Sequence, residues 1–158
     1  MRKIFVLLFL ASSLIVTRTS AQSMGSSYQT AIGIKFYPGA LSIKHFTQED
    51  RALEGLVNFW DGGFRFTGLY EIHGNISGAE GLKWYVGPGV HIGWYNGYAY
   101  NDYYYANGSF SFGIDGILGL DYKISGAPID LSLDVQPYFE LNHPYFAVWG
   151  GLAVRYTF

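Results

Sequence analysis

The ionisable residues of this sequence lie within apolar segments, where an unpaired charge is energetically unfavourable. In the second half of the chain Asp130 and Arg155 each lie between apolar neighbours, and further acids and bases recur at alternate positions. A buried charge without a partner is costly, so such groups either pair with one another or belong to a site that uses them. The pattern therefore poses a choice between a reactive site and a structural network of ion pairs.

The four histidines are the other candidates for chemistry. His73 and His91 are predicted to face the same side of neighbouring strands at different heights, which argues against a shared metal ion. His45 and His143 fall near predicted loops. Lipid-remodelling barrel enzymes, the lipid A deacylases and palmitoyltransferases, need a histidine with a serine and an acid at the membrane boundary, and His143 has no serine beside it in a recognisable motif. We therefore expect no catalytic residue, no metal ligand and no cofactor.

The elements that position these residues are predicted to be β-strands, because apolar and polar residues alternate with a period of two. Turn residues rich in glycine and proline separate the alternating segments. Pro88 and Pro137 fall inside strands, where we expect a β-bulge at each site. An even number of strands predicts an all-β, eight-stranded antiparallel up-and-down transmembrane β-barrel. The expected strands are 28–36, 41–46, 53–60, 64–73, 82–95, 110–124, 129–141 and 146–158.

The apolar rows of these strands are expected to face outward, toward lipid. Charged residues make up 14% of the chain, against roughly 25% in an ordinary soluble domain. The polar rows hold small residues and charges of both signs, which suit a crowded interior better than a water-exposed surface. Aromatic residues gather near strand ends, as in the girdles of membrane barrels, at Tyr28, Phe36, Trp60, Phe64, Trp84, Trp94, Tyr122, Tyr145, Tyr156 and Phe158. The alternative is a soluble secreted or periplasmic β-barrel that binds a small apolar ligand inside.

The first 21 residues have the three parts of a secretory signal peptide: a basic start, an apolar run and a small-residue cleavage site ending at Ala21. We therefore expect a signal peptide over 1–21 and a barrel domain over 22–158. The sequence contains no cysteine, so no disulfide is expected. A formal net charge of −2 gives no reason to expect nucleic acid as a partner.

The last residues, Arg155-Tyr156-Thr157-Phe158, resemble the terminal strand signal of Gram-negative outer-membrane barrels. That signal alternates hydrophobic residues and ends in an aromatic residue; Tyr156 and Phe158 match it. The segment from Gly113 to Tyr122 also resembles a recurrent strand of the small, mostly uncharacterised eight-stranded outer-membrane barrel proteins. The resemblance implies the cell outer membrane as location, lipid and the barrel-assembly machinery as partners, and no catalytic residues.

The inward charges are predicted to form a structural salt-bridge network that fills the barrel. Turn positions predict that Asp130 lies between Lys123 and Arg155, and that Glu71 faces Lys83 around Ser77. Replacement of Ser132 by alanine is expected to have little effect.

The longest connection, from Asn96 to Gly108, is expected to be extracellular. Tyrosine, asparagine and glycine dominate it, as they do adaptable binding loops. Its candidate recognition residues are Tyr98, Tyr100, Tyr103, Tyr104 and Tyr105. The sequence therefore predicts a structural or surface-interaction role, with an extracellular ligand as a possible partner.

Overall fold

The computed structural model describes residues 28–60, 62–96, 99–100, 103–104, 108–142 and 144–158. The predicted signal peptide lies outside them. Within the described part of the chain, no helix has the length and apolar character of a membrane span. The eight long strands are β1 (Thr30–Phe36), β2 (Ala40–Gln48), β3 (Arg51–Trp60), β4 (Gly63–Asn75), β5 (Leu82–Tyr95), β8 (Ser109–Lys123), β9 (Ile129–Glu140) and β10 (Tyr145–Thr157).

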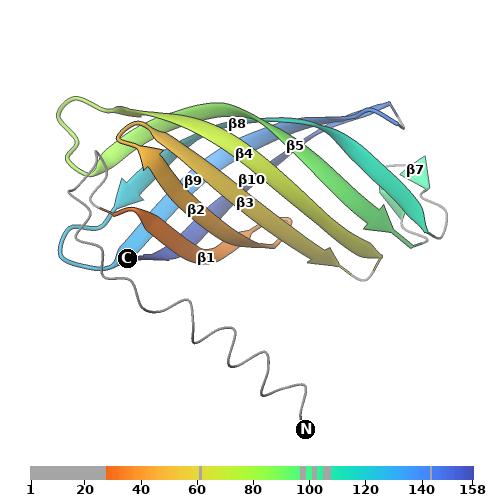
Figure 1. The fold of residues 1–158 in the computed structure, drawn as a ribbon, viewed down its shortest axis with the longest axis horizontal. Coiled ribbons are helices and arrows are strands. Elements are labelled where there is room, and N and C mark those ends of the chain that lie inside the picture. The colour runs from red at the N-terminus through yellow and green to blue at the C-terminus, as the bar shows by residue number, and fades with distance from the viewer. Residues whose placement is uncertain (1–27, 61, 97–98, 101–102, 105–107, 143) are drawn as a thin grey trace, which may run out of the picture.

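These strands close into one antiparallel barrel in the order β1-β10-β9-β8-β5-β4-β3-β2, as Figure 1 shows. The predicted fold class and its eight strands are confirmed, with boundaries shifted by a few residues. The seam between first and last strands extends to the last residue, because Thr30 N donates to Phe158 O at 3.1 Å and Phe158 N donates to Thr30 O at 2.9 Å. The pair β6 (Ala99–Tyr100) and β7 (Tyr103–Tyr104) forms a small separate hairpin that sequence reasoning did not predict.

The barrel has two different ends. The end that carries Thr30 and Phe158, here called the terminal end, has the turns 49–50, 76–81 and 124–128. The opposite loop end carries the long connection between β5 and β8. The wall is lower beside the β1–β2 hairpin: the β1–β10 ladder stops at Phe36 and Leu152, while β10 continues to Tyr145 along β9. Figure 1 shows this hairpin ending short of its neighbours.

The outer surface is apolar and the interior is polar, which confirms the predicted direction of the rows. Leu118 and Leu133 on the outside are 54% and 59% exposed. On the alternate inward positions, Arg65, Glu71 and Arg155 are buried. Strand alternation separates the two kinds of side chain onto opposite faces of the sheet, and the barrel closes with the apolar face outward.

The aromatic girdle is confirmed at most of the expected positions, and two tyrosines are corrections. Phe36, Phe64, Trp84, Trp94, Tyr122, Tyr156 and Phe158 are exposed. Tyr28 instead turns into the terminal end of the barrel, where its hydroxyl donates to Asp121 Oδ2 at 3.2 Å. Tyr145 belongs to the inward row and packs near Tyr138. The side chain of Trp60 lies outside the described residues.

The two in-strand prolines are accommodated without the bulges predicted for them. Pairing between β4 and β5 runs from Leu69–Gly89 to Ile72–Val86 and omits the positions beside Pro88 without a register shift. Pairing between β8 and β9 likewise omits the positions beside Pro137. Each proline lacks an N–H, and the ladder is interrupted there and resumes in the same register.

Candidate functional site

The interior is rich in carboxyl groups. The inward rows bury four lysine and arginine side chains, Lys35, Lys44, Arg65 and Arg155. They bury seven acids, which are Glu54, Glu71, Asp115, Asp121, Asp130, Asp134 and Glu140. Acids therefore outnumber lysine and arginine within the described interior.

One group of these residues lies toward the terminal end and is here called the Arg155 cluster: Lys44, Glu54, Glu71, Asp121, Asp130 and Arg155. The Arg155 guanidinium contacts Glu54 closely, Asp130 at 3.1 Å and Asp121 at 3.9 Å. It also donates to the hydroxyls of Ser42 at 2.7 Å and Ser132 at 2.8 Å. One cation thus joins side chains from β2, β3, β8 and β9 to β10, which ties the wall together from inside.

Lys44 is the second cation of this cluster. Its Nζ lies 3.0 Å from Glu71 Oε2 and 3.4 Å from Asp121 Oδ1. It also lies 4.3 Å from the ring centroid of Tyr85, a cation–π contact. On β4, His73 Nε2 lies 2.9 Å from Glu71 Oε2. Asp121 is therefore shared between the two cations, and Glu71 is held by Lys44 and His73.

A second group lies toward the loop end and is here called the Arg65 cluster: Arg65, His91, Asp115, Tyr138, Glu140 and Trp149. Arg65 reaches Asp115 at 2.5 Å, and its guanidinium carbon lies 4.2 Å from the ring centroid of Tyr138 and 4.3 Å from that of Trp149. Stacking on aromatic rings suits the planar, weakly hydrated guanidinium. Gln136 adds a hydrogen bond to Asp115 at 3.0 Å.

The Arg65 cluster contains the one arrangement in the described interior that looks like catalytic chemistry. His91 Nδ1 lies 2.6 Å from Asp115 Oδ2, and its Nε2 lies 3.3 Å from Glu140 Oε1. The Ser111 hydroxyl contacts Glu140 rather than the histidine. All four side chains are buried, so a lipid at the outer surface does not reach them. A nucleophile needs its base within hydrogen-bonding distance, and here a carboxylate stands between serine and histidine.

The two clusters meet at a middle layer. Lys35 Nζ lies 2.6 Å from Asp134 Oδ1, and the Tyr85 hydroxyl donates to Asp134 Oδ2 at 2.7 Å. Because Tyr85 also carries Lys44 over its ring, the interior is a continuous polar filling rather than two isolated sites. An eight-stranded barrel leaves room for little more than such side chains.

Of the two partners predicted for Asp130, one forms the expected ion pair. Lys123 and Arg155 both lie opposite Asp130 in the register. The Arg155 guanidinium pairs with it, as expected. Lys123 is a correction: its ammonium donates to the carbonyl oxygens of Ile124 at 3.0 Å and Ala127 at 2.5 Å, so it holds the β8–β9 turn.

The predicted pairing of Glu71 with Lys83 is wrong. Lys83 lies opposite Asn75 because the β4–β5 turn spans 76–81 instead of centring on Ser77. Glu71 pairs with Lys44 deep in the barrel. Lys83 remains half-buried at the terminal end, with its Nζ 5.8 Å from the ring centroid of Phe46.

Sequence reasoning missed Glu54, which has a closer tie to Arg155 than any residue it named. Apolar and polar residues alternate poorly in the segment 53–60, so its sequence does not show clearly which row faces inward. A signal was nevertheless present: the alternative register would place a carboxylate on the lipid face, where a charge is unfavourable. If this cost is weighed at each position of the strand, the sequence predicts that Glu54 faces inward.

The remaining predicted residues lie in several parts of the barrel. Tyr156 and Phe158 lie on the outer surface beside the barrel seam. Tyr100 and Tyr103 lie in the β6–β7 hairpin with Tyr104, but Tyr98, Tyr105, His143 and the side chains of this hairpin fall outside the described residues. His73 and His91 face inward on β4 and β5 at different heights, as predicted. His45 is exposed and hydrogen-bonded to the Thr30 hydroxyl at 2.8 Å.

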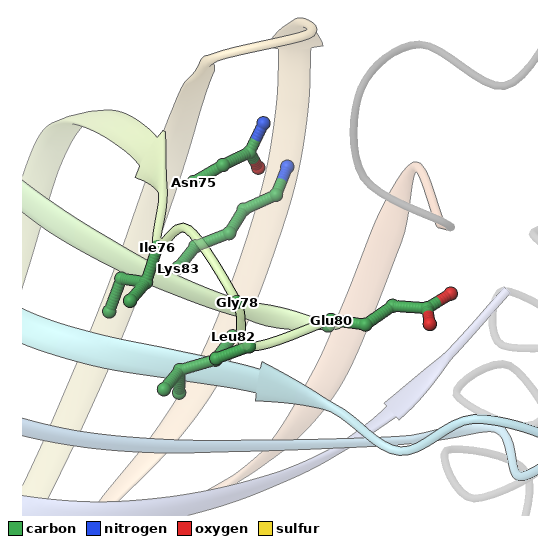
Figure 2. A pocket seen from close by; sticks show the side chains of 8 residues that line it. Asn75, Ile76, Gly78, Glu80, Leu82 and Lys83 are labelled. Carbon is green, nitrogen blue, oxygen red and sulfur yellow. The ribbon is translucent and has the colours of Figure 1, made fainter.

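The described residues offer little to hold a ligand. No group of three or more histidine, aspartate and glutamate side chains there is arranged to hold a metal ion. A hollow at the terminal end is lined by residues of the β4–β5 turn, including Asn75, Ile76, Glu80, Leu82 and Lys83. In Figure 2 Asn75 and Lys83 extend to one side of this turn while Ile76 and Leu82 extend to another, so its polar groups do not converge.

Comparisons with known proteins bear on the fold. No family model matches the chain. No curated protein matches it either. Among solved structures, the N-terminal β-barrel domain of Pseudomonas aeruginosa OprF is similar, with a TM-score of 0.59 and 20% sequence identity over 82% of this chain and 94% of that one. The likeness shows that the chain has the eight-stranded barrel fold of that outer-membrane domain.

Proposed function

We propose that this protein is an integral barrel of the bacterial outer membrane with a structural or surface-interaction role and no catalysis. The observation that carries the proposal is the inversion of the barrel: its long outward rows are apolar, and charged side chains fill its interior.

The outward rows are unsuited to water. Exposed isoleucine, leucine, valine and phenylalanine side chains cover every long strand, for example Ile43, Leu53, Phe66, Val90 and Leu152. A soluble protein rarely exposes such a continuous apolar surface. In a bilayer the same surface contacts acyl chains, and the exposed aromatic residues near both ends of the strands suit the two interfaces.

The interior supports a structural role. Ion pairs that join five strands resist collapse of the wall and occupy the space that a substrate would need. An apolar ligand, as the soluble alternative requires, would meet charged groups there. The lipid-remodelling alternative needs a reactive histidine at the outer surface, and His91 is buried. The terminal Tyr156 and Phe158, exposed at the seam, suit recognition by the barrel-assembly machinery during insertion.

The orientation of the wall is tested by placing a charge on it. Leu118→Arg, on the outward row of β8, is expected to impair insertion, by about 2–4 kcal/mol for a residue near the midplane. Leu118→Ile is the matched control and should insert normally. The measurements are recovery of the full chain from outer-membrane fractions with detergent and heat-modifiable migration on gels. Release of the wild-type protein in soluble form, or normal insertion of the arginine variant, contradicts the proposal.

A surface-recognition role is supported by the long connection between β5 and β8. Its β6–β7 pairing gives the connection a local hairpin. Its tyrosine-rich composition resembles that of adaptable binding loops. Deletion of residues 98–106 tests this role: intact cells should lose binding to host or abiotic surfaces while the barrel still shows heat-modifiable migration. Unchanged binding favours the purely structural role.

A further inference from the structure

Two acidic side chains of the Arg155 cluster are diagonal neighbours on the inner face of the barrel. Glu54 on β3 and Glu71 on β4 are inward residues of neighbouring strands, offset along the ladder because Glu54 pairs with Leu69 and Glu71 with Ala52. They are 2% and 0% exposed. Diagonal neighbours on one face of a sheet lie about 7–8 Å apart, so two side chains as long as glutamate can bring their carboxyl groups together there.

In each of the two carboxyl groups, only one oxygen has a hydrogen-bond or ion-pair partner among the described residues. Glu54 Oε1 accepts hydrogen bonds from Arg155 and from the Ser42 hydroxyl, the latter at 2.6 Å. Glu71 Oε2 is held by Lys44 at 3.0 Å and by His73 at 2.9 Å. The other two oxygens, Glu54 Oε2 and Glu71 Oε1, are buried and accept no hydrogen bond from any described residue. Both carboxyl groups therefore have an unused acceptor.

Two ionised carboxylates in this position would repel each other in surroundings of low dielectric constant. Two unsatisfied buried acceptors add a further cost. A single proton between the two groups removes both costs, because one carboxyl then donates to the other. The described interior holds seven acids and four lysine and arginine side chains, so a proton on this pair also reduces the excess of negative charge.

We propose that Glu54 and Glu71 share one proton and form a buried carboxyl–carboxylate pair that links the Arg155 and Lys44 halves of the network. The pair is a proton-binding site at the centre of the terminal half of the barrel. The charged and titratable groups that surround it, strand by strand, are Lys35 on β1, Lys44 on β2, His73 on β4, Tyr85 on β5, Asp121 on β8, Asp130 and Asp134 on β9, and Arg155 on β10.

The shared proton makes stability depend on pH with a definite sign. In the unfolded chain both glutamates are ionised above about pH 5, since a free glutamate side chain titrates near 4.3. The folded barrel then holds one proton more than the unfolded chain from this pair. Stability falls with rising pH wherever the folded state binds more protons, so the pair stabilises the barrel most in acid and loses this contribution as the pair ionises.

The experiment is infrared spectroscopy of the folded full chain in phospholipid vesicles, with all glutamates carrying a 13C-labelled side-chain carboxyl. The label shifts the signal of a protonated glutamic acid away from that of aspartic acid. The chain has five glutamates, of which Glu49 and Glu80 are exposed. At neutral pH the wild type should show the band of about one protonated glutamic acid per chain. Glu71→Gln should lose this band, because the amide N–H of glutamine can donate a hydrogen bond to Glu54 while Glu54 stays ionised.

Two controls locate the signal. Glu140→Gln changes the remaining buried glutamate and should retain the band. This result assigns the band to Glu54 and Glu71 by elimination, even if Glu71→Gln does not fold. Asp134→Asn removes a buried acid that already has Lys35 as partner and should also retain it. Absence of the band in the wild type, its persistence in folded Glu71→Gln, or its loss in Glu140→Gln overturns the proposal.

Discussion

The Arg65 and Arg155 clusters each gather carboxylates around one buried guanidinium, but they hold it differently. Arg155 is surrounded by Glu54, Asp130 and Asp121 and by two serine hydroxyls. Arg65 has Asp115 as its close carboxylate, with Glu140 at 4.0 Å, and is covered by the rings of Tyr138 and Trp149.

The two clusters differ in the hydrogen-bond and ion-pair partners that each carboxylate would retain if its arginine were removed. Asp115 retains His91 at 2.6 Å and Gln136 at 3.0 Å. Around Arg155, Asp121 retains Lys44 and Tyr28, but Glu54 is left with the Ser42 hydroxyl and its acidic neighbour Glu71. The Arg65 cluster thus has reserve partners, whereas the Arg155 cluster depends on one cation. The residues closest to the seam are held by the less redundant arrangement.

The largest expected effect is therefore that of Arg155→Met. Removal of one partner from a buried ion pair typically costs about 3–5 kcal/mol, because the carboxylates left behind remain buried. We expect the urea midpoint of the barrel refolded in vesicles to fall accordingly. Arg51→Met is the matched control, since Arg51 sits beside the β2–β3 turn with its side chain 42% exposed. Equal midpoints for the two variants would show that the cluster contributes little.

Arg65→Met should cost less, about 2–3 kcal/mol, in the range of hydrogen bonds to charged groups. Methionine retains apolar contact with Tyr138 and Trp149, and His91 continues to hold Asp115. The same urea titration measures it. A second variant, His91→Phe in the Arg65→Met background, removes the reserve partner and should add a further loss. If Arg65→Met is as damaging as Arg155→Met, the proposed redundancy does not exist.

Much of the barrel was predictable because alternation is a local property. The rows from Phe110 to Tyr122 and from Ile129 to Glu140 alternate strongly enough to fix the strands and to sort their side chains onto two faces. The low charge content and the small residues of the polar rows then favoured an apolar face directed outward. The strands β2 and β3 were harder to place, since apolar and polar residues alternate less regularly in their sequences. Tyr28 was misplaced because a tyrosine at a strand end suits both the lipid interface and the mouth of the barrel.

The contacts of the site were less predictable because they depend on turn geometry and on strands distant in sequence. The β9–β10 turn set Asp130 against Arg155 correctly, but one misjudged turn moved Glu71 away from Lys83. Glu54 and Arg155 are 101 positions apart in the chain and meet only because the barrel closes. Local pattern fixes which side chains face inward, whereas closure decides which of them touch.

The smallest expected effect concerns Ser132, whose replacement the sequence predicted to have little effect. Its side chain is 2% exposed, and its hydroxyl accepts a hydrogen bond from Arg155 Nη1 at 2.8 Å. Ser132→Ala should therefore cost about 1 kcal/mol, the usual net value of one such bond, because the same nitrogen keeps Asp130 at 3.1 Å. Ser125→Ala, in the exposed β8–β9 turn, is the control and should leave the urea midpoint unchanged. In the Arg155→Met background the serine has no guanidinium to contact, so the effect of Ser132→Ala should shrink there; an unchanged effect would place the role of Ser132 outside the Arg155 cluster.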